Sequence, residues 1–199
     1  MRGVFLSKER PKYRQIVEAA VEVIAENGYY ASQVSKIARK ANVADGTIYL
    51  YFKNKEDILV SVFKEKMGDF IKKTIKTIEP KKTASEKLFA LIQMHFEQLS
   101  ESPHLAIVTQ LELRQSKPEL RYEINKVLKS YLDVIDAIIK QGIEEGEIRN
   151  DINPQLIRQM IFGTLDETVT TWVMKSQRYK LEDQAEDVHQ LLTKGFFIS

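Results

Sequence analysis

The chain has 199 residues, 43% of them hydrophobic, which is enough to bury the core of one large domain or two small ones. It has no cysteine, so it cannot form disulfides or a thiolate active site, and we expect a reducing, cytoplasmic location. No apolar run approaches the roughly 20 residues that span a bilayer, so no membrane partner and no signal peptide are expected. The net charge of +2 is unevenly distributed along the chain, because residues 1–55 carry ten basic and five acidic residues and the remainder carries 20 basic and 23 acidic ones. The positive N-terminal part is suited to bind a polyanion.

The N-terminal quarter has apolar residues at helical spacing, separated by short segments that favour helix ends. Gly28 is suited to a left-handed C-terminal cap, Ser32 and Asn54 are suited to N-caps, and Asp57 takes the capping-box position after Asn54. The helices expected here cover residues 10–27, 33–40, 47–51 and a long segment from residue 55.

The rest of the chain also has helical periodicity, with no β-alternation, repeat or low-complexity tract. The segment 85–100 is apolar on most sides, which indicates a buried helix, and Gly146, Asn153 and Pro154 mark a break between helices. Further helices are expected between Pro103 and Pro118 and over residues 120–145, 155–174 and 182–197. The sequence therefore predicts an all-α protein.

Residues 42–57, NVADGTIYLYFKNKED, combine features of a helix-turn-helix. Two short helices that cross steeply must bury a few positions against each other while the outer face of the second stays free. Ile37, Ala41, Val43 and Ile48 meet this demand, and Asn42 at the turn tolerates a left-handed conformation.

The second helix of this motif carries side chains suited to DNA. Gly46 lets the backbone approach a DNA strand, Thr47 offers a hydroxyl and a methyl group, and Tyr49 and Tyr51 reach phosphate oxygens. Lys55 adds a charge at the positive N-terminal end of the next helix. Packing within the domain is the alternative role for the tyrosines, and we favour DNA contact.

The stretch GYYASQVSKIARKANVADGTIYLYFKNKEDIL, residues 28–59, resembles the DNA-binding region of the TetR family of bacterial repressors. The resemblance covers about the first 60 residues and includes the T-I-Y-x-Y-F-K-x-K-E box. It implies a homodimer in which each subunit has a three-helix helix-turn-helix domain for double-stranded operator DNA, residues 1–55, and a larger helical domain for a small-molecule inducer and dimerisation, residues 56–199. By position, the implied DNA contacts are Ala44, Asp45, Gly46, Thr47, Tyr49, Tyr51 and Lys55, with Gln33 and Lys36 as further candidates.

Two residues depart from the common family pattern. Ala44 stands where the family often has serine, so the recognition helix lacks a hydroxyl cap. Asp45 stands where lysine or a neutral residue is common; its carboxylate would either accept from a cytosine amine or act structurally through the helix dipole, and we favour the structural role.

The last two helices are expected to form a dimerising four-helix bundle with those of a second subunit. Gly163 would allow another backbone to approach closely. The apolar positions that suggest this seam are Ile157, Ile161, Leu165, Val169, Trp172, Val173, Val188, Leu191, Leu192 and Phe196.

The apolar helix over residues 85–100 is either plain core, which we favour, or one wall of an elongated cavity. The cavity residues would be Phe89, Met94, Phe96, Leu105, Val108, Phe162 and Leu165. The cations available for a phosphate-bearing head group at its mouth are Arg114, Arg121, Lys126 and Arg158. The alternative inducer is a hydrophobic drug, aromatic or cationic, for which buried Asp166 or Glu112 would supply the counter-charge.

The stretches TQLELRQSKPELR and GTLDETVTTWVM are similar to segments of the acyl-CoA-responsive fatty-acid-degradation repressors of bacilli, which belong to the TetR family. This similarity implies repression of β-oxidation genes that ends when long-chain acyl-CoA binds, without a cofactor. The inducer must favour a form whose two DNA-reading heads are wrongly spaced, and the long helix from residue 55 is the expected lever.

Other classes of function have less support. His95, His104 and His189 are far apart in sequence, and no metal-binding or phosphate-loop motif occurs, so we expect neither catalytic nor metal-ligating residues. A helical adaptor that binds only proteins would explain the helices but not the second helix with its glycine and tyrosines.

Overall fold

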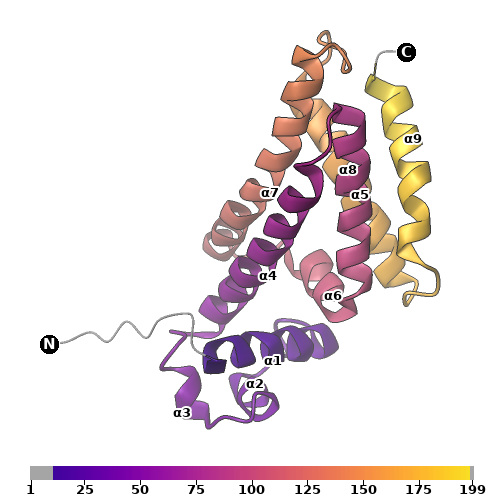
Figure 1. The fold of residues 1–199 in the computed structure, drawn as a ribbon. Helices are drawn as coiled ribbons and strands as arrows, with labels where there is room; N and C mark the ends of the chain where they lie inside the picture. The colour runs from indigo at the N-terminus through magenta and orange to yellow at the C-terminus, as the bar shows by residue number, and fades with distance from the viewer. Residues whose placement is uncertain (1–10, 198–199) are drawn as a thin grey trace, which may run out of the picture.

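The computed structural model describes residues 11–197, and their regular structure is helical (Figure 1). The elements are α1 (Pro11–Asn27), α2 (Val34–Lys40), α3 (Asp45–Ile48), α4 (Lys55–Ile78), α5 (Ala84–Ser100), α6 (Pro103–Glu112), α7 (Pro118–Glu144), α8 (Pro154–Met174), the 3₁₀-helix η1 (Leu181–Gln184) and α9 (Ala185–Phe196). The predicted all-α fold, with a small N-terminal and a larger C-terminal helical part, is confirmed. Within residues 11–197, no helix combines the length and the apolar character that crossing a membrane requires.

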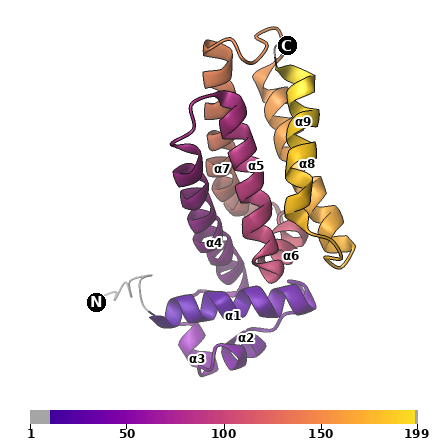
Figure 2. The ribbon, with the colours of Figure 1, turned by 45° about the vertical axis from the view of Figure 1, so that its right-hand side comes forward.

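Helices α1, α2 and α3 form a small head at one end of the long helices (Figure 2). α1 packs against α2, α4 and α6, and α2 packs against α3. Of the four residues expected at the crossing of the motif, Ile37, Ala41 and Ile48 are buried, and Val43 is partly buried against the head core. Asn42 has a φ of 50°, in the left-handed region, as the turn requires.

Ser32 does not cap α2, so that prediction is wrong. Gln33 occupies the N-cap position, without a side-chain cap. The Ser32 hydroxyl instead donates to the carbonyls of Val23 at 3.1 Å and Gly28 at 2.7 Å. Gly28 ends α1 with a φ of 74°, so the chain folds back and the buried Ser32 hydroxyl ties the α1–α2 loop to the last turns of α1.

The recognition helix α3 is shorter at its C-terminal end than predicted, because the chain turns after Ile48. The amides of Tyr51 and Phe52 both donate to the carbonyl of Ile48 at 3.0 Å. The turn places Phe52 in the head core, where its ring stacks on Tyr13 with centroids 5.2 Å apart. Tyr49 and Tyr51 therefore lie in a turn rather than on a regular helix.

Helix α4 belongs to both parts of the protein. Its predicted cap is confirmed, since Asn54 Oδ1 accepts from the amide of Asp57 at 2.8 Å. Phe63 and the residues before it pack in the head core, whereas Phe70 and the residues after it pack in the larger core. The boundary between the two cores thus lies within one continuous helix, and the predicted division after residue 55 stays a prediction.

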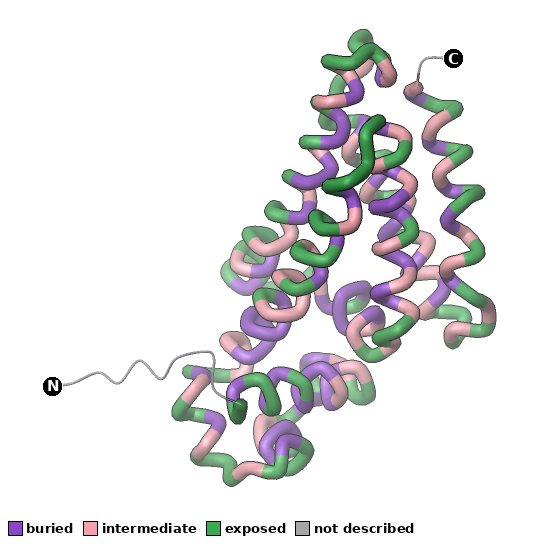
Figure 3. The backbone as a smooth tube through the Cα atoms, in the orientation of Figure 1, coloured by how far each residue is buried: buried purple, intermediate pink, exposed green. Residues whose placement is uncertain are grey.

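Helix α5 is the buried centre of the larger part, as its apolar character predicted. It contacts α4, α6, α7, α8, η1 and α9, and buried residues follow the inner faces of these helices (Figure 3).

The expected dimer seam is wrong for most of its residues. Ile157, Ile161, Leu165, Val169, Trp172, Val188, Leu192 and Phe196 are buried in the core of their own chain. Helical periodicity identifies a buried face but does not say whether the same chain or a second copy covers it. Leu191 differs, because 72% of it is exposed. Gly163 is also not packed closely within the chain, since a Cβ at this position would meet no atom within 4 Å.

Candidate DNA-binding surface and ligand cavity

The outer face of α3 is exposed, as a DNA-reading helix requires. Ala44, Asp45 and Gly46 are exposed, and Tyr49 in the following turn is 59% exposed. Thr47 is half-buried on the same short helix. Ala44 is the N-cap residue of α3 and provides no side-chain hydrogen bond there. Asp45 lies in the first turn of α3, where its negative charge interacts favourably with the helix dipole.

Gly46 has no structural reason inside the chain to be glycine. A Cβ at this position would meet no atom within 4 Å, and the residue does not have a positive φ. Glycine in a helix costs about 1 kcal/mol relative to alanine. The missing side chain therefore indicates an approach from outside the protein, in keeping with backbone contact to DNA.

The other predicted DNA contacts already have partners within the head. The ring of Tyr51 is half-buried, 6.3 Å from that of Tyr13. The Lys55 ammonium donates to the Tyr30 carbonyl at 2.9 Å and lies 4.5 Å from the centroid of the Tyr29 ring. Burial lowers the pKa of Lys55, which nearby Glu112 partly offsets.

On α2, Gln33 and Lys36 are exposed, and Lys36 donates to Asn27 Oδ1 at 3.2 Å. Sequence reasoning missed Arg39 and Ser35, which line a surface hollow with Ala44 and Asp45. Arg39 stands three residues after Lys36, and that helical spacing was the available signal. These assignments of individual DNA contacts stay predictions.

An apolar cavity lies between α4, α5, α6, α7 and α8. Its walls are formed by Phe63, Met67, Phe70, His95, Leu99, Leu105, Thr109, Gln110, Leu113, Leu128, Tyr131, Phe162 and Asp166. The cavity measures about 40 Å³, whereas pockets for small ligands measure roughly 300–1,000 Å³. The cavity is thus contracted, and a long ligand can enter only if its walls move.

The structure brings together part of the predicted ligand set. Leu105, Phe162 and Asp166 line the cavity, and Arg114 lies beside it through an ion pair with Asp166. The others lie elsewhere: Phe96 and Leu165 in the larger core, Val108 in the head core, Phe89 against the ring of His189, Met94 half-buried on α5, and Arg121 at the start of α7, where it donates to the Gln115 carbonyl. Their roles in ligand binding stay predictions.

Sequence reasoning missed the walls that α4 and α7 contribute. Phe63, Met67 and Phe70 are spaced four and three residues apart on α4, and Leu128 and Tyr131 are three apart on α7. That spacing marks a buried helix face. It does not show that the two faces enclose a space, because that depends on how the helices pack.

His95 and Tyr131 form a buried polar pair in the cavity wall. His95 Nδ1 and the Tyr131 hydroxyl oxygen are 2.8 Å apart, and His95 Nε2 has no hydrogen-bond partner. Burial lowers the pKa of His95 to about 3 and raises the pKa of Tyr131. Both side chains are therefore neutral near pH 7, which suits a wall that faces an apolar ligand.

One edge of the cavity carries an ion pair between the α6–α7 linker and α8. Arg114 Nη2 lies 2.5 Å from Asp166 Oδ2; the Arg114 side chain is 64% exposed and that of Asp166 is 8% exposed. With its amide nitrogen turned toward Asp166, Gln110 places a donor 2.9 Å from Oδ1. The buried carboxylate is thus held by two partners, one of which reaches solvent.

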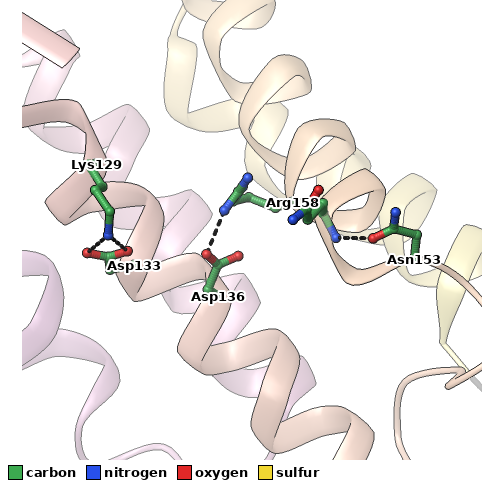
Figure 4. Close-up of polar contacts among 6 residues, drawn as sticks. Lys129, Asp133, Asp136, Asn153 and Arg158 are labelled. Atoms are coloured by element: carbon green, nitrogen blue, oxygen red, sulfur yellow. Dashed lines mark hydrogen bonds and ion pairs between the residues drawn. The ribbon is translucent and has the colours of Figure 1, made fainter. Parts of the chain in front are cut away.

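The two remaining candidate cations lie outside the cavity wall. Arg158 on α8 donates to Asp136 Oδ2 on α7 at 2.7 Å, near the turn where Asn153 caps α8 (Figure 4). Lys126 pairs with Glu123 at 2.6 Å. Of the four cations considered for a head group, only Arg114 bonds to a residue of the cavity wall.

The head and the bundle that encloses this cavity both match known sequences. Residues 16–62 match the bacterial regulatory proteins of the tetR family, and residues 63–195 match the C-terminal region of YsiA-like proteins. The chain belongs to the TetR family. This TetR-family chain is 60% identical over 190 residues to the fatty acid metabolism regulator protein of Bacillus subtilis (strain 168), over 96% of this chain and 98% of the relative.

Two solved structures share its fold closely. A transcriptional regulator FadR from Bacillus subtilis in complex with stearoyl-CoA has a TM-score of 0.90 and 61% identity, covering 92% of this chain and 98% of that one. The fatty acid degradation regulator FadR from Bacillus halodurans has a TM-score of 0.89 and 55% identity with the same coverage. As a TetR-family member, the chain is a DNA-binding transcription regulator and not an enzyme, which confirms the prediction and leaves the adaptor alternative without support.

Proposed function

We propose that this TetR-family regulator is a homodimeric repressor of fatty-acid degradation genes, acting in the cytoplasm, which leaves its operator when long-chain acyl-CoA binds. The observation that carries the proposal is the likeness to the Bacillus subtilis regulator solved with stearoyl-CoA, at 61% identity over 92% of this chain. The apolar cavity supplies a matching place for an acyl chain.

Arg114 is the cation best placed for a phosphate of the head group. Its guanidinium reaches solvent while its partner Asp166 lies in the cavity wall. An arginine fork binds phosphate through two parallel hydrogen bonds. If Arg114 turns toward a phosphate, Gln110 remains to satisfy the Asp166 carboxylate.

Exposed apolar side chains on α8 and α9 support the homodimer. Leu156 and Met160 on α8 are 50% and 43% exposed, and Leu191 on α9 is 72% exposed. Gly163 follows Leu156 and Met160 at helical spacing on α8, and a Cβ built there would meet open space. Apolar patches of this kind mark interaction surfaces, and one that pairs with itself forms a two-fold dimer.

A cationic drug is less well supported as the inducer. Asp166 is already paired with Arg114, and Glu112 accepts from the Tyr29 amide at 2.8 Å and from Gln115 at 2.5 Å. Neither carboxylate is free to act as a counter-charge without the loss of these bonds.

The test is fluorescence anisotropy of the purified protein on DNA from its own upstream region, titrated with stearoyl-CoA. Free stearate and CoA are the controls, because only a ligand that joins chain and head group should release the DNA. Release of the DNA by stearoyl-CoA, but not by free stearate or CoA, supports the proposal. DNA binding that no acyl-CoA disturbs contradicts it and leaves a TetR-family repressor with another inducer.

A further inference from the structure

We propose that Glu112, the last residue of α6, transmits occupancy of the cavity to the DNA-reading head. This inference rests on the proposed function, because it concerns how a ligand in that cavity changes DNA binding. The contacts of α6 with the head and with the cavity carry the argument.

Glu112 is a buried carboxylate at the junction of the two parts. It is 8% exposed; its Oε1 accepts from the amide of Tyr29, in the α1–α2 loop, at 2.8 Å, and its Oε2 accepts from Gln115 Nε2 at 2.5 Å. A buried carboxylate that loses its donors is strongly destabilised. Glu112 therefore keeps the α1–α2 loop and the α6–α7 linker in a fixed relationship.

The first residue of α4 also holds the α1–α2 loop. The Lys55 ammonium donates to the Tyr30 carbonyl and lies over the ring of Tyr29. We call Tyr29, Lys55, Glu112 and Gln115 the head clamp. The nearby bonds of Ser116 with Tyr30 and of Lys117 with Glu56 are exposed, and exposed pairs contribute little. Among these polar bonds between the head and the α6 region, the bond of Glu112 is thus the buried one.

The same short helix is a wall of the cavity. Leu105 and Gln110 on α6 and Leu113 just after it line the cavity, and Leu105 and Leu113 also pack against the head core. Arg114, two residues after Glu112, pairs with Asp166, which lines the cavity from α8. A wall that moves to admit a ligand therefore displaces residues directly bonded to the head.

The size of the cavity makes this displacement necessary. A space of about 40 Å³ must grow several-fold to hold a long chain, and packed interiors respond by discrete shifts of whole elements. α6 has only ten residues, whereas α4, α7 and α8 have more than twenty each. α6 is the shortest helix of the cavity wall, and Glu112 at its end passes a shift of this helix to Tyr29.

The competing route runs through α4 alone, because α4 also lines the cavity and leads directly to the recognition motif. The two routes differ in one respect. If α4 carries the whole signal, the loss of the Glu112 bond to Tyr29 leaves the response to ligand unchanged.

The experiment measures a release factor for each variant. This factor is the Kd for operator DNA in the presence of saturating stearoyl-CoA divided by the Kd in its absence. The wild type is compared with Glu112→Ala, Glu112→Gln and a matched control, Glu147→Ala. Glu147 also accepts from backbone amides, those of Ala84 at 2.9 Å and Ser85 at 3.1 Å, at the start of α5 and away from the head clamp.

We expect the release factor of Glu112→Ala to fall at least about fivefold, a change within the usual range of coupling between sites. Glu147→Ala should keep the wild-type factor, and isothermal titration should show unchanged affinity of both variants for stearoyl-CoA. Glu112→Gln should restore most of the response, because its carbonyl can accept from Tyr29 and its amide can donate to Gln115 Oε1, which has no partner.

If Glu112→Ala retains the wild-type release factor, the inference is wrong. If Glu112→Ala does not fold, Glu112→Leu decides instead, since it removes the buried carboxylate and its bond with the Tyr29 amide while an apolar side chain fills the space. An unchanged release factor in this variant also overturns the inference. Failure of stearoyl-CoA to release the wild type would contradict the proposed function itself, so the two failures are distinguishable.

Discussion

Arg114 and Asp166 join the α6–α7 linker to α8 at the edge of the cavity, with one partner in solvent and the other buried. An ion pair of this kind can open toward an anion without exposing the core. It links the apolar wall to the surface at which a charged head group would remain.

Arg114→Gln should weaken stearoyl-CoA binding about tenfold, the effect of losing one charge-assisted contact of about 1.4 kcal/mol. Because the arginine side chain is 64% exposed, solvent screens the pair, and the free energy of unfolding should fall by no more than about 1 kcal/mol. Isothermal titration and thermal unfolding measure the two effects. Lys126→Gln is the control, and equal affinities of the two variants for stearoyl-CoA would contradict a role of Arg114 at the head group.

Tyr49→Phe should weaken operator binding about fivefold and leave the melting temperature unchanged. The hydroxyl is lost from a side chain that is 59% exposed, and one hydrogen bond contributes about 1 kcal/mol. Tyr122→Phe, at a tyrosine on α7 that is 63% exposed, is the matched control and should bind DNA like the wild type. Anisotropy titrations on operator DNA decide, and wild-type affinity in Tyr49→Phe would remove this residue from the contact surface.

Gly46→Ala should separate stability from DNA binding. An alanine meets no atom within 4 Å and favours the helix, so the protein should be as stable as the wild type or more so by up to about 1 kcal/mol. Operator affinity should fall, because the methyl group stands between the backbone and DNA. Gly28→Ala provides the contrast: its φ of +74° is strained for alanine, so that variant should unfold at lower temperature. Full operator affinity in Gly46→Ala would refute the close approach.

Leu191→Arg should convert the proposed dimer to a monomer, because it places a charge among the exposed apolar side chains Leu156, Met160 and Leu191 on α8 and α9. Leu191 is 72% exposed in the single chain, so the monomer should remain folded. Analytical ultracentrifugation gives the mass, and circular dichroism checks the helices. Leu111→Arg, at a leucine on α6 that is 46% exposed, is the control and should stay dimeric. A dimeric Leu191→Arg would place the interface elsewhere.

Stability should decline as pH falls from about 6.5 toward 4.5, with His95 as one cause. Burial holds the pKa of His95 near 3, below the value of 6.5 for an unperturbed histidine. In this window the unfolded chain binds a proton that the folded chain does not, so acid favours unfolding by up to about 1.4 kcal/mol per pH unit.

His95→Phe should reduce this pH slope, and His104→Gln, at an exposed histidine, should keep it. Denaturant unfolding at several pH values measures the slope. If the slopes of wild type and His95→Phe agree, His95 is not the buried group responsible.

Local chemistry determined much of this protein from its sequence. Gly28 and Gly146 adopt left-handed conformations, Asn54 and Asn153 cap helices, and Asn42 turns the DNA-binding motif, because each outcome depends on backbone geometry within a few residues. The exposed recognition face follows from the same short-range pattern.

The tertiary structure alone decided which apolar faces meet. Periodicity showed that α8 and α9 have apolar faces, but only packing placed Ile161 and Leu192 in their own core and left Leu191 exposed. The cavity and the bond from Glu112 to Tyr29 join residues far apart in sequence, 83 positions in the latter case. Such contacts arise from the way rigid helices pack, which depends on all their side chains together, and no local pattern encodes them.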